Sequence, residues 1–424
     1  MKKKAMILGA GIGQIPFINL LKERGCYVIA VSVKGNYPGF EIADKCYYVD
    51  TRDKEAILEI AREEGIDIIT TDQTDVSVPA VAYVAEKMGL KGIGCVTAEK
   101  FTDKYVMRCY AENAGIPVPK FIQVNCVDNI IDKVSRMDYP LISKPVNSSG
   151  SRGVHRIDNP NELVEKVKMS LDSSVDNKVI IEEFIEGKEY LADGIALDGD
   201  YITLDFGIKE YFDLPDTYIS KMCMFSSSVL AKNEAEIDVV KTNTELVNAF
   251  NLPFGITHAE YIYSEKRHKT YLVEIAARGG GVYLSSHLTP RASGVNSNVL
   301  LIDYLTENKI ANFRNIKLDQ KVSCWRCFAL KPGFISKIQN VEEIRQIPGV
   351  TEAFLDDLTI GMKIGELKDD TCKLGPILFL GNNREECYDA IQKVKDTLCI
   401  ETTDENNNIS GCLLYTSDAA DDRI

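Results

Sequence analysis

The chain has 424 residues, 45% of them hydrophobic and 26% charged, which is typical of a soluble globular protein with about two to four domains. Its 49 Lys and Arg against 63 Asp and Glu leave a formal net charge of −14, which disfavours nucleic acid and membranes as partners. The twelve cysteines are scattered singly through apolar runs, so we expect reduced thiols and a cytoplasmic location. Glycines interrupt the apolar stretch after the N-terminal lysines, so we expect neither a signal peptide nor a membrane span.

Short apolar runs alternate with helical stretches from Ala5 to about Cys95, which predicts a doubly wound parallel sheet over residues 1–95. The first turn, Gly9-Ala-Gly11-Ile-Gly13-Gln14, has glycines of the kind that let a backbone approach a phosphate. Gln14 stands where a dinucleotide fingerprint has glycine, and Lys34 follows the second strand where an acid would hold a ribose. A nicotinamide oxidoreductase is therefore disfavoured, and a packing turn or substrate-lining loop is preferred.

The remaining chain divides by its patterns into a helix, a mixed region and a final module. Thr97 to Ala114 predicts one helix that Gly115 ends. An α+β domain follows to about residue 310, and a small α/β module spans about 320–400. The last stretch, 404–424, has no periodic apolar face and resembles translated sequencing-adapter sequence, so we assign it no domain and no function.

A lysine precedes a loop of small residues in the α+β region. Lys144 is expected at a strand end, before Ser148-Ser149-Gly150 and a second strand. A P-loop is excluded because its lysine follows the glycines and opens a helix. The amides of such a loop can fold over phosphates as a lid, and an ordinary hairpin turn with a surface lysine remains the alternative.

Forty residues later, Val179 to Glu182 predicts a strand that a short bend joins to a second strand near Glu189. An adenosine could lie along this edge, with the backbone of Glu183 to Ile185 facing adenine and the Glu189 carboxylate facing ribose. A solvated acidic hairpin is the simpler interpretation of the segment alone.

Two apolar alternating segments, beginning at His258 and Tyr271, predict an antiparallel hairpin. A turn centred on Arg267 places Glu260 opposite Glu274, and Ile262 opposite Leu272. Like charges so placed destabilise a sheet unless a cation neutralises them, and two carboxylates suit Mg²⁺ completed by nucleotide phosphates. A register slip that separates the acids is the alternative.

The order and spacing of these segments over residues 1–400 resemble the ATP-grasp ligases, and the module near 320–400 resembles the L-amino acid ligase branch. The resemblance implies a Rossmann-like domain at 1–95, an ATP-grasp domain at 96–310 with a flexible lid at about 120–185, and a C-terminal ligase module. It implies ATP and Mg²⁺, or Mn²⁺, as cofactors. The implied nucleotide contacts are Lys104, Lys144, Ser149, Gly150, Glu182, Glu183, Ile185 and Glu189, and the implied metal ligands are Glu260 and Glu274.

The resemblance also implies the reaction. Lys144 and Arg278 would take part in catalysis, with Arg278 holding an acyl phosphate or a substrate carboxylate. The expected enzyme joins a small carboxylate to an amine through an acyl phosphate and releases ADP and phosphate. A homodimer is one expected oligomeric state. The family usually has Asn two positions after the second metal acid, and this chain has Ala276, which leaves the number of metal ions open. A bicarbonate-using carboxylase and a non-catalytic nucleotide-binding protein are the alternatives.

Overall fold

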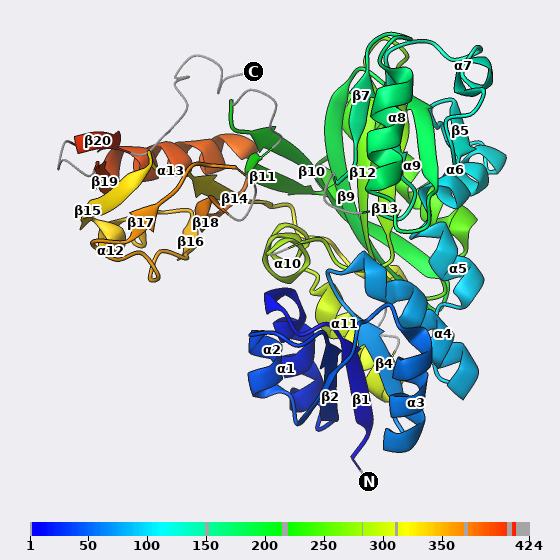
Figure 1. The fold of residues 1–424 in the computed structure, drawn as a ribbon. Helices are drawn as coiled ribbons and strands as arrows, with labels where there is room; N and C mark the ends of the chain where they lie inside the picture. The colour runs from blue at the N-terminus through cyan, green and yellow to red at the C-terminus, as the bar shows by residue number, and fades with distance from the viewer. Residues whose placement is uncertain are drawn as a thin grey trace. The chain divides into compact units, whose positions relative to one another are not determined.

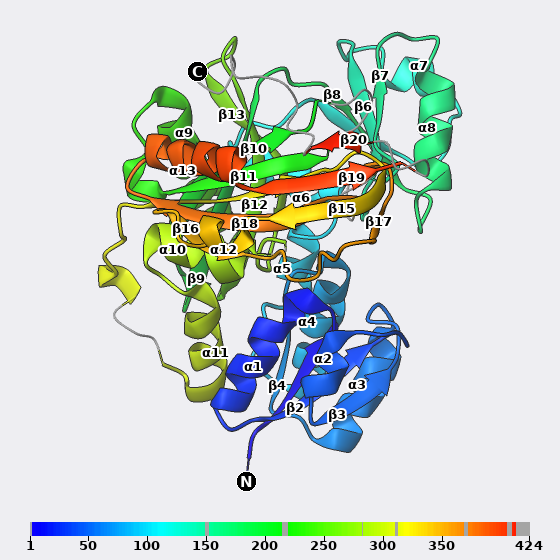
Figure 2. The same ribbon diagram turned by 90° about the vertical axis from the view of Figure 1, so that its left-hand side faces the viewer.

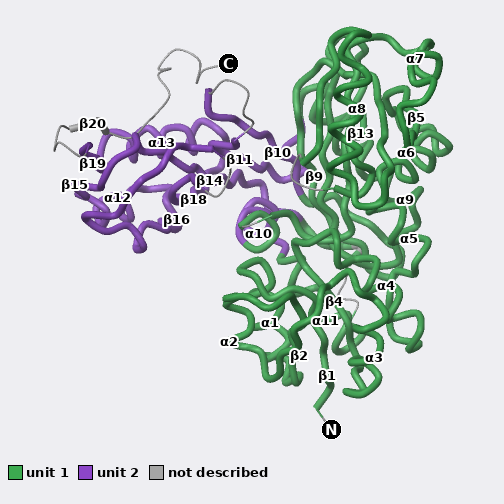
Figure 3. Tube along the Cα trace, in the orientation of Figure 1, with its two compact units in different colours: residues 1–204, 232–286, 296–317 green, residues 205–231, 287–295, 318–424 purple. Residues whose placement is uncertain are grey.

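The computed structural model describes residues 2–148, 152–213, 219–281, 283–309, 313–368, 372–404 and 409–412. Two compact units divide the chain (Figure 3): the first holds residues 1–204, 232–286 and 296–317, and the second holds 205–231, 287–295 and 318–424. The division falls within strand β10, Asp200–Tyr211. These units do not follow the three predicted domains, whose boundaries remain a prediction.

The first unit begins with a four-stranded parallel sheet in the order β3-β2-β1-β4, as the alternating pattern predicted. Its strands are β1 (Lys4–Leu8), β2 (Tyr27–Ser32), β3 (Lys45–Tyr48) and β4 (Ile68–Thr71). Its helices are η1 (Ile12–Gln14), α1 (Ile15–Glu23), α2 (Pro38–Ile42), α3 (Lys54–Glu64), η2 (Asp75–Ser77) and α4 (Val78–Met88). Helices α1 and α3 lie on opposite sides of this sheet (Figures 1 and 2).

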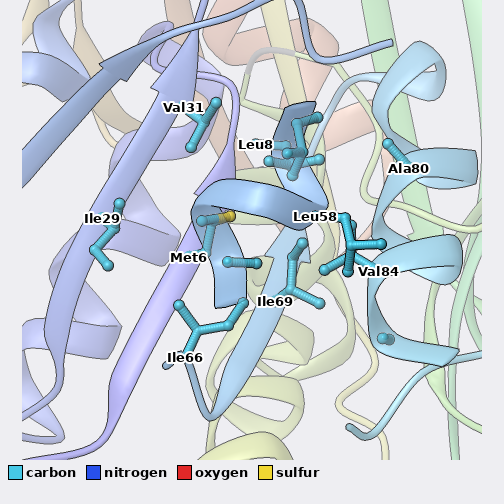
Figure 4. Packing of buried hydrophobic residues seen from close by; sticks show 12 residues of the cluster. Met6, Leu8, Ile29, Val31, Leu58, Ile66, Ile69, Ala80 and Val84 are labelled. Carbon is cyan, nitrogen blue, oxygen red and sulfur yellow. The ribbon is translucent and has the colours of Figure 1, made fainter. Parts of the chain in front are cut away.

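One hydrophobic core of this sheet lies on the side that α3 and α4 cover. Met6 and Leu8 of β1 are fully buried against Leu58 of α3 and Val84 of α4 (Figure 4). Burying a side chain of this size contributes about 1.5–3 kcal/mol relative to leaving it exposed. This packing fixes the sheet, and therefore the loops at the carboxyl ends of its strands.

The single helix predicted over Thr97–Ala114 is wrong, because the chain forms α5 (Cys95–Lys100) and α6 (Lys104–Asn113). The side chain of Asp103 accepts hydrogen bonds from the amides of Tyr105 and Val106 and so caps α6. An aspartate at this position satisfies amides that have no partner in the first helical turn. Lys104 consequently stands at the first position of α6.

A second sheet, entirely antiparallel, follows in the order β5-β8-β6-β7. It consists of β5 (Phe121–Val124), β6 (Leu141–Pro145), β7 (His155–Ile157) and β8 (Val179–Glu183), with α7 (Ile130–Lys133) and α8 (Leu163–Asp172). Leu163 and Val167 of α8 are buried in one cluster with Leu141 and Ile181, so α8 covers one face. The strand, loop and strand expected around Lys144 are therefore present as β6 and β7.

The third sheet portion of the first unit is antiparallel, in the order β13-β12-β9. It consists of β9 (Lys188–Leu197), β12 (Gly255–Ser264) and β13 (Lys269–Ala276), and the unit also contains α9 (Glu234–Phe250), α11 (Ser297–Glu307) and η5 (Phe313–Asn315). Strands β8 and β9 belong to different sheets, so the acidic hairpin considered for Val179–Glu189 is wrong. The bend between them instead joins two sheets.

The second unit contains an antiparallel sheet, β10-β11-β14-β18-β16, and a smaller one, β17-β15-β19-β20. Its elements are β10 from Asp205, β11 (Ser220–Ser227), η3 (Ser228–Leu230), η4 (Leu284–Leu288), of which His287 and Leu288 lie in this unit, α10 (Thr289–Ser293), β14 (Val322–Phe328), β15 (Gly333–Gln339), α12 (Val341–Ile344), β16 (Val350–Ala353), β17 (Lys363–Ile364), β18 (Leu374–Gly381), α13 (Arg384–Thr397), β19 (Cys399–Thr403) and β20 (Ile409–Cys412). Strand β20 belongs to the predicted tail, 404–424, and pairs with β19, which precedes the tail. Residues 405–408 and 413–424 of the tail lie outside the described residues.

The fold class predicted from the sequence, a mixture of α/β and α+β parts in several domains, is confirmed. None of the helices in the described ranges combines the length and the apolar character that a membrane crossing requires.

Candidate active site

The two predicted metal acids lie opposite each other in the hairpin β12–β13. Glu260 pairs with Glu274, as expected, and His258 pairs with Ala276. Nearer the turn the register shifts by one residue, so Ile262 faces Tyr271, and the predicted pairing with Leu272 is wrong. The shift is a bulge after Glu260, where the carbonyl of Val273 accepts a hydrogen bond from Arg108 Nη2 at 2.6 Å.

Lys104 connects three parts of the site. Its Nζ lies 2.8 Å from Glu274 Oε1 and donates to the carbonyl oxygen of Ser148 at 2.6 Å. Its own amide donates to the carbonyl of Val146 at 2.9 Å, so the start of α6 is attached to the loop after β6. Lys104 as a whole is only 6% exposed, so its side chain is shielded from bulk solvent.

Lys144 stands on β6 and is buried beside a second buried cation. Lys144 Nζ lies 2.6 Å from Glu182 Oε2, and Arg108 Nε lies 2.6 Å from Glu182 Oε1. Burial lowers the pKa of Lys144, and Glu182 opposes that shift. Burial alone would raise the pKa of Glu182, but the charges of Arg108 and Lys144 outweigh it and lower this pKa. The surface lysine considered from the sequence is thus wrong, and the Glu182 carboxylate is occupied by two cations.

The bend after β8 offers few free backbone groups. The amide of Glu183 donates to the carbonyl of Lys120 at 3.0 Å, and that of Phe184 donates to Pro140 at 2.9 Å. The Glu183 side chain accepts from the amide of Asp138 at 3.0 Å and lies 2.8 Å from Lys120 Nζ. A Cβ at Gly187 would lie 2.2 Å from the Tyr263 carbonyl, so only glycine allows the bend to approach β12 this closely.

Ile185 and Glu189 differ in exposure although they follow one another closely. Ile185 is 6% exposed, whereas Glu189, near the start of β9 and paired with Ile262, lies at the surface. Ser149 and Gly150, the predicted loop contacts, lie outside the described residues.

Arg278 follows β13 and makes a bidentate ion pair. Its Nε and Nη2 lie 2.9 and 2.7 Å from the two carboxylate oxygens of Asp75, and its Nη1 donates to the carbonyl of Gly279 at 2.8 Å. Burial lowers the pKa of Arg278, but Asp75 outweighs it and the pKa is raised. Among the described residues, the contacts with Asp75 and Gly279 use three of the five N–H groups of the guanidinium. One N–H on Nη1 and one on Nη2 remain, and together they form the end of the guanidinium fork.

Two acids of this region were not singled out from the sequence. Asp72 and Asp75 follow β4, at the carboxyl end of the parallel sheet. Polar residues directly after a strand of such a sheet are a usual place for a ligand site, and this was the available signal. Arg108 was not singled out as a site residue either, and nothing in the sequence showed that it is completely buried.

Comparison with known proteins identifies two domains in the chain. Residues 137–286 match the ATP-grasp domain, and residues 326–403 match the L-amino acid ligase C-terminal domain 2. The chain contains an ATP-grasp domain. It is 26% identical to alanine–anticapsin ligase of Bacillus subtilis over 361 residues, which cover 78% of this chain and 73% of that protein. It is 24% identical to L-arginine-specific L-amino acid ligase of the same organism, over 86% of this chain and 88% of that one.

The ATP-grasp fold is also seen in a solved structure. The crystal structure of L-amino acid ligase from Bacillus licheniformis superposes with a TM-score of 0.75 at 23% identity, over 94% of this chain and 98% of that chain. The two family matches confirm the predicted ATP-grasp domain and L-amino acid ligase module, and the predicted enzyme class agrees with the relatives.

Proposed function

We propose that this ATP-grasp protein is an ATP-dependent ligase that activates a small carboxylate as an acyl phosphate, joins it to an amine, and releases ADP and phosphate. The observation that carries the proposal is the position of Lys104 Nζ, which contacts both Glu274 and the carbonyl of Ser148. A cation, an acid pair and the start of a small-residue loop therefore meet at one point, which is what transfer of a phosphoryl group requires.

We assign the triphosphate to Lys104 and Lys144, with the amides of Ser149 and Gly150 as further contacts. Both ammonium groups form ion pairs with carboxylates, Lys104 with Glu274 and Lys144 with Glu182. A bound nucleotide would supply phosphate oxygens as alternative partners for both. Ribose is assigned to Glu189, which lies at the surface of β9.

Adenine is assigned to the bend between the two sheets. The amides of Glu183 and Phe184 are already used within the protein, so the backbone of Ile185 is the group that we expect to face the adenine edge. The Glu182 carboxylate has two buried cations as partners, and we therefore assign it to the positioning of Lys144 rather than to adenine.

The residues present fit a divalent cation. Glu260 and Glu274 face each other across the hairpin, and Mg²⁺ is commonly held by one or two carboxylates together with phosphate oxygens. Mg²⁺, or Mn²⁺ in its place, would neutralise phosphate charge during transfer. No cluster of three or more His, Cys, Asp or Glu in the described ranges has the arrangement of a metal site, so phosphate oxygens and water would have to complete the coordination of a cation at this acid pair.

Arg278 is assigned to the carboxylate that becomes phosphorylated. Bringing one carboxylate charge to 4 Å from one phosphate charge costs about 4 kcal/mol at an effective dielectric of 20. The end of the Arg278 fork has the planar shape that binds a carboxylate or phosphate through two hydrogen bonds. Positioning and charge compensation are thus the work of the protein, and no protein nucleophile is needed.

The names of the relatives suggest the substrate class. The two Bacillus subtilis proteins are ligases of alanine and of L-amino acids, so we propose an amino acid as at least one of the two substrates. The match to the L-amino acid ligase C-terminal domain favours this reaction over a bicarbonate-using carboxylase.

The test is a panel of amino acids and small acids assayed for phosphate release, followed by product analysis. With the correct acid and no amine, hydroxylamine should trap the acyl phosphate as a hydroxamate, and ADP should accumulate. Release of AMP would contradict the mechanism. ATP binding without any acid-stimulated turnover would favour the non-catalytic alternative, and dependence on bicarbonate would favour the carboxylase.

A further inference from the structure

Asp72 is a completely buried acid that the proposed reaction does not use directly. It follows β4, and its Oδ1 accepts a hydrogen bond from the amide of Gly279 at 2.9 Å. Its backbone carbonyl accepts from Gln14 Nε2, and Gln73 Nε2 lies 3.4 Å from its Oδ2. Asp72 thus connects the end of the N-terminal parallel sheet to the residue that follows Arg278.

The contact at Gly279 is too close for any other residue. A Cβ at this position would lie 2.5 Å from Asp72 Oδ1 and 2.4 Å from Ser285 Oγ. Carbon atoms do not approach oxygen at these distances, so a side chain at position 279 would displace the turn or the side chains of Asp72 and Ser285. The absence of a side chain therefore lets the carboxylate reach the backbone.

A second hydrogen bond carries this restraint to the guanidinium group. Arg278 Nη1 donates to the carbonyl of the same Gly279 whose amide Asp72 holds. Asp75, three residues after Asp72, holds the other side of the guanidinium through Nε and Nη2. The short segment after β4 therefore fixes Arg278 at two points, one direct and one through Gly279.

We propose that Asp72 is a positioning residue that orients the free end of the Arg278 fork by holding Gly279. The effect of Asp72 on catalysis rests on the proposed function, because only that function places a substrate carboxylate at Arg278. The restraint itself is a property of the unliganded protein. Burial, which raises the pKa of Asp72 to about 7, agrees with a carboxyl group that lies away from water.

The first experiment measures the restraint without substrate. Hydrogen exchange followed by mass spectrometry should show that a peptide covering residues 277–281 gains one rapidly exchanging amide in Asp72→Ala. Asp72→Asn keeps an oxygen acceptor and should retain the protection. Asp67→Asn is the matched control, because Asp67 accepts from the amide of Lys4 at 2.8 Å at the other end of β4. Equal exchange in Asp72→Ala and wild type would overturn the proposal.

The second experiment measures the consequence. In Asp72→Ala the KM for the acid should rise at least tenfold while the KM for ATP changes less than twofold, and Asp72→Asn should restore most of the loss. A general folding defect would raise both KM values or lower the melting temperature in proportion, and equal loss for both substrates would overturn the proposal. Should the wild type show no acid-dependent turnover, the proposed function fails, whereas the exchange experiment still decides the role of Asp72.

Discussion

Lys104 and Glu274 form an ion pair, with Nζ and Oε1 2.8 Å apart, across 170 residues of sequence. Lys104 is a predicted phosphate-binding residue and Glu274 a predicted metal ligand. Their ion pair therefore holds both side chains in the site before a nucleotide binds. It also changes the expected behaviour of Glu274, because this carboxylate is not left to face Glu260 alone.

Glu274→Gln should reduce turnover at least a hundredfold, since a neutral amide oxygen binds Mg²⁺ more weakly than a carboxylate and does not compensate its charge. Its melting temperature should fall modestly, by an amount equivalent to about 1–2 kcal/mol, because buried Lys104 loses its charged partner. The control is the double variant Lys104→Met with Glu274→Gln, in which the stability losses should not add. Normal turnover of Glu274→Gln at ordinary Mg²⁺ would reject the metal site.

Lys144→Met should weaken ATP binding at least tenfold, measured by calorimetry, because a buried ammonium facing the phosphates is lost. Glu182 keeps Arg108 as a partner, so we expect a stability loss of only about 1 kcal/mol in denaturant unfolding. Arg108→Met is the comparison: it removes the partner of both Glu182 and the Val273 carbonyl and should cost about 3–5 kcal/mol. If Lys144→Met proves the more destabilising of the two while ATP affinity holds, Lys144 is structural.

Asp72→Asn should make the protein more stable at pH 8 than the wild type. The pKa of Asp72 is about 7 in the folded protein against 3.8 as the ordinary value, so the folded state retains a proton that the unfolded state has lost. Stability therefore falls as pH rises from about 4 to about 7, by up to about 4 kcal/mol at 1.36 kcal/mol per pKa unit.

The stability gain of Asp72→Asn should accordingly be small at pH 4.5 and largest at pH 8, in melting curves recorded across this range. The exposed Asp67→Asn variant should show no such growth. A gain that is the same at every pH would mean that Asp72 does not titrate near neutrality in the folded protein.

Arg278→Lys should lower kcat/KM for the acid at least a hundredfold while ATP affinity changes little. Lysine keeps the charge but cannot hold Asp75 through two hydrogen bonds and bind a carboxylate with a second pair of N–H groups. Asp75→Asn should show a smaller loss of the same kind. An equal loss of ATP affinity in Arg278→Lys would show that Arg278 binds the nucleotide rather than the substrate acid.

The sequence predicted the elements whose patterns are local. Alternating apolar residues correctly placed Glu260 opposite Glu274, yet the pairing nearer the turn was wrong because a bulge follows Glu260. That bulge accompanies a hydrogen bond from Arg108, a contact between distant segments that no local pattern contains. The break between α5 and α6 was missed although Asp103, which caps the second helix, is a recognisable signal.

The site was predicted less completely than the fold. The role expected for Glu182 did not allow for two buried cations, because burial of Arg108 and Lys144 depends on how the second sheet packs. Likewise, the segment Asp72 to Asp75 becomes part of the site only when β4 and the residues after β13 come together. The resemblance to a family predicted a role for Arg278, while only the structure showed the residues that hold it in place.

The central claim, that the acid is activated as an acyl phosphate, is tested most directly by isotope transfer. A substrate acid labelled with ¹⁸O in its carboxyl group should pass one labelled oxygen to the released phosphate during a complete reaction with ATP and amine. Mass spectrometry should find that phosphate singly labelled and the ADP unlabelled. Label in AMP, or phosphate without label while product forms, would contradict the account.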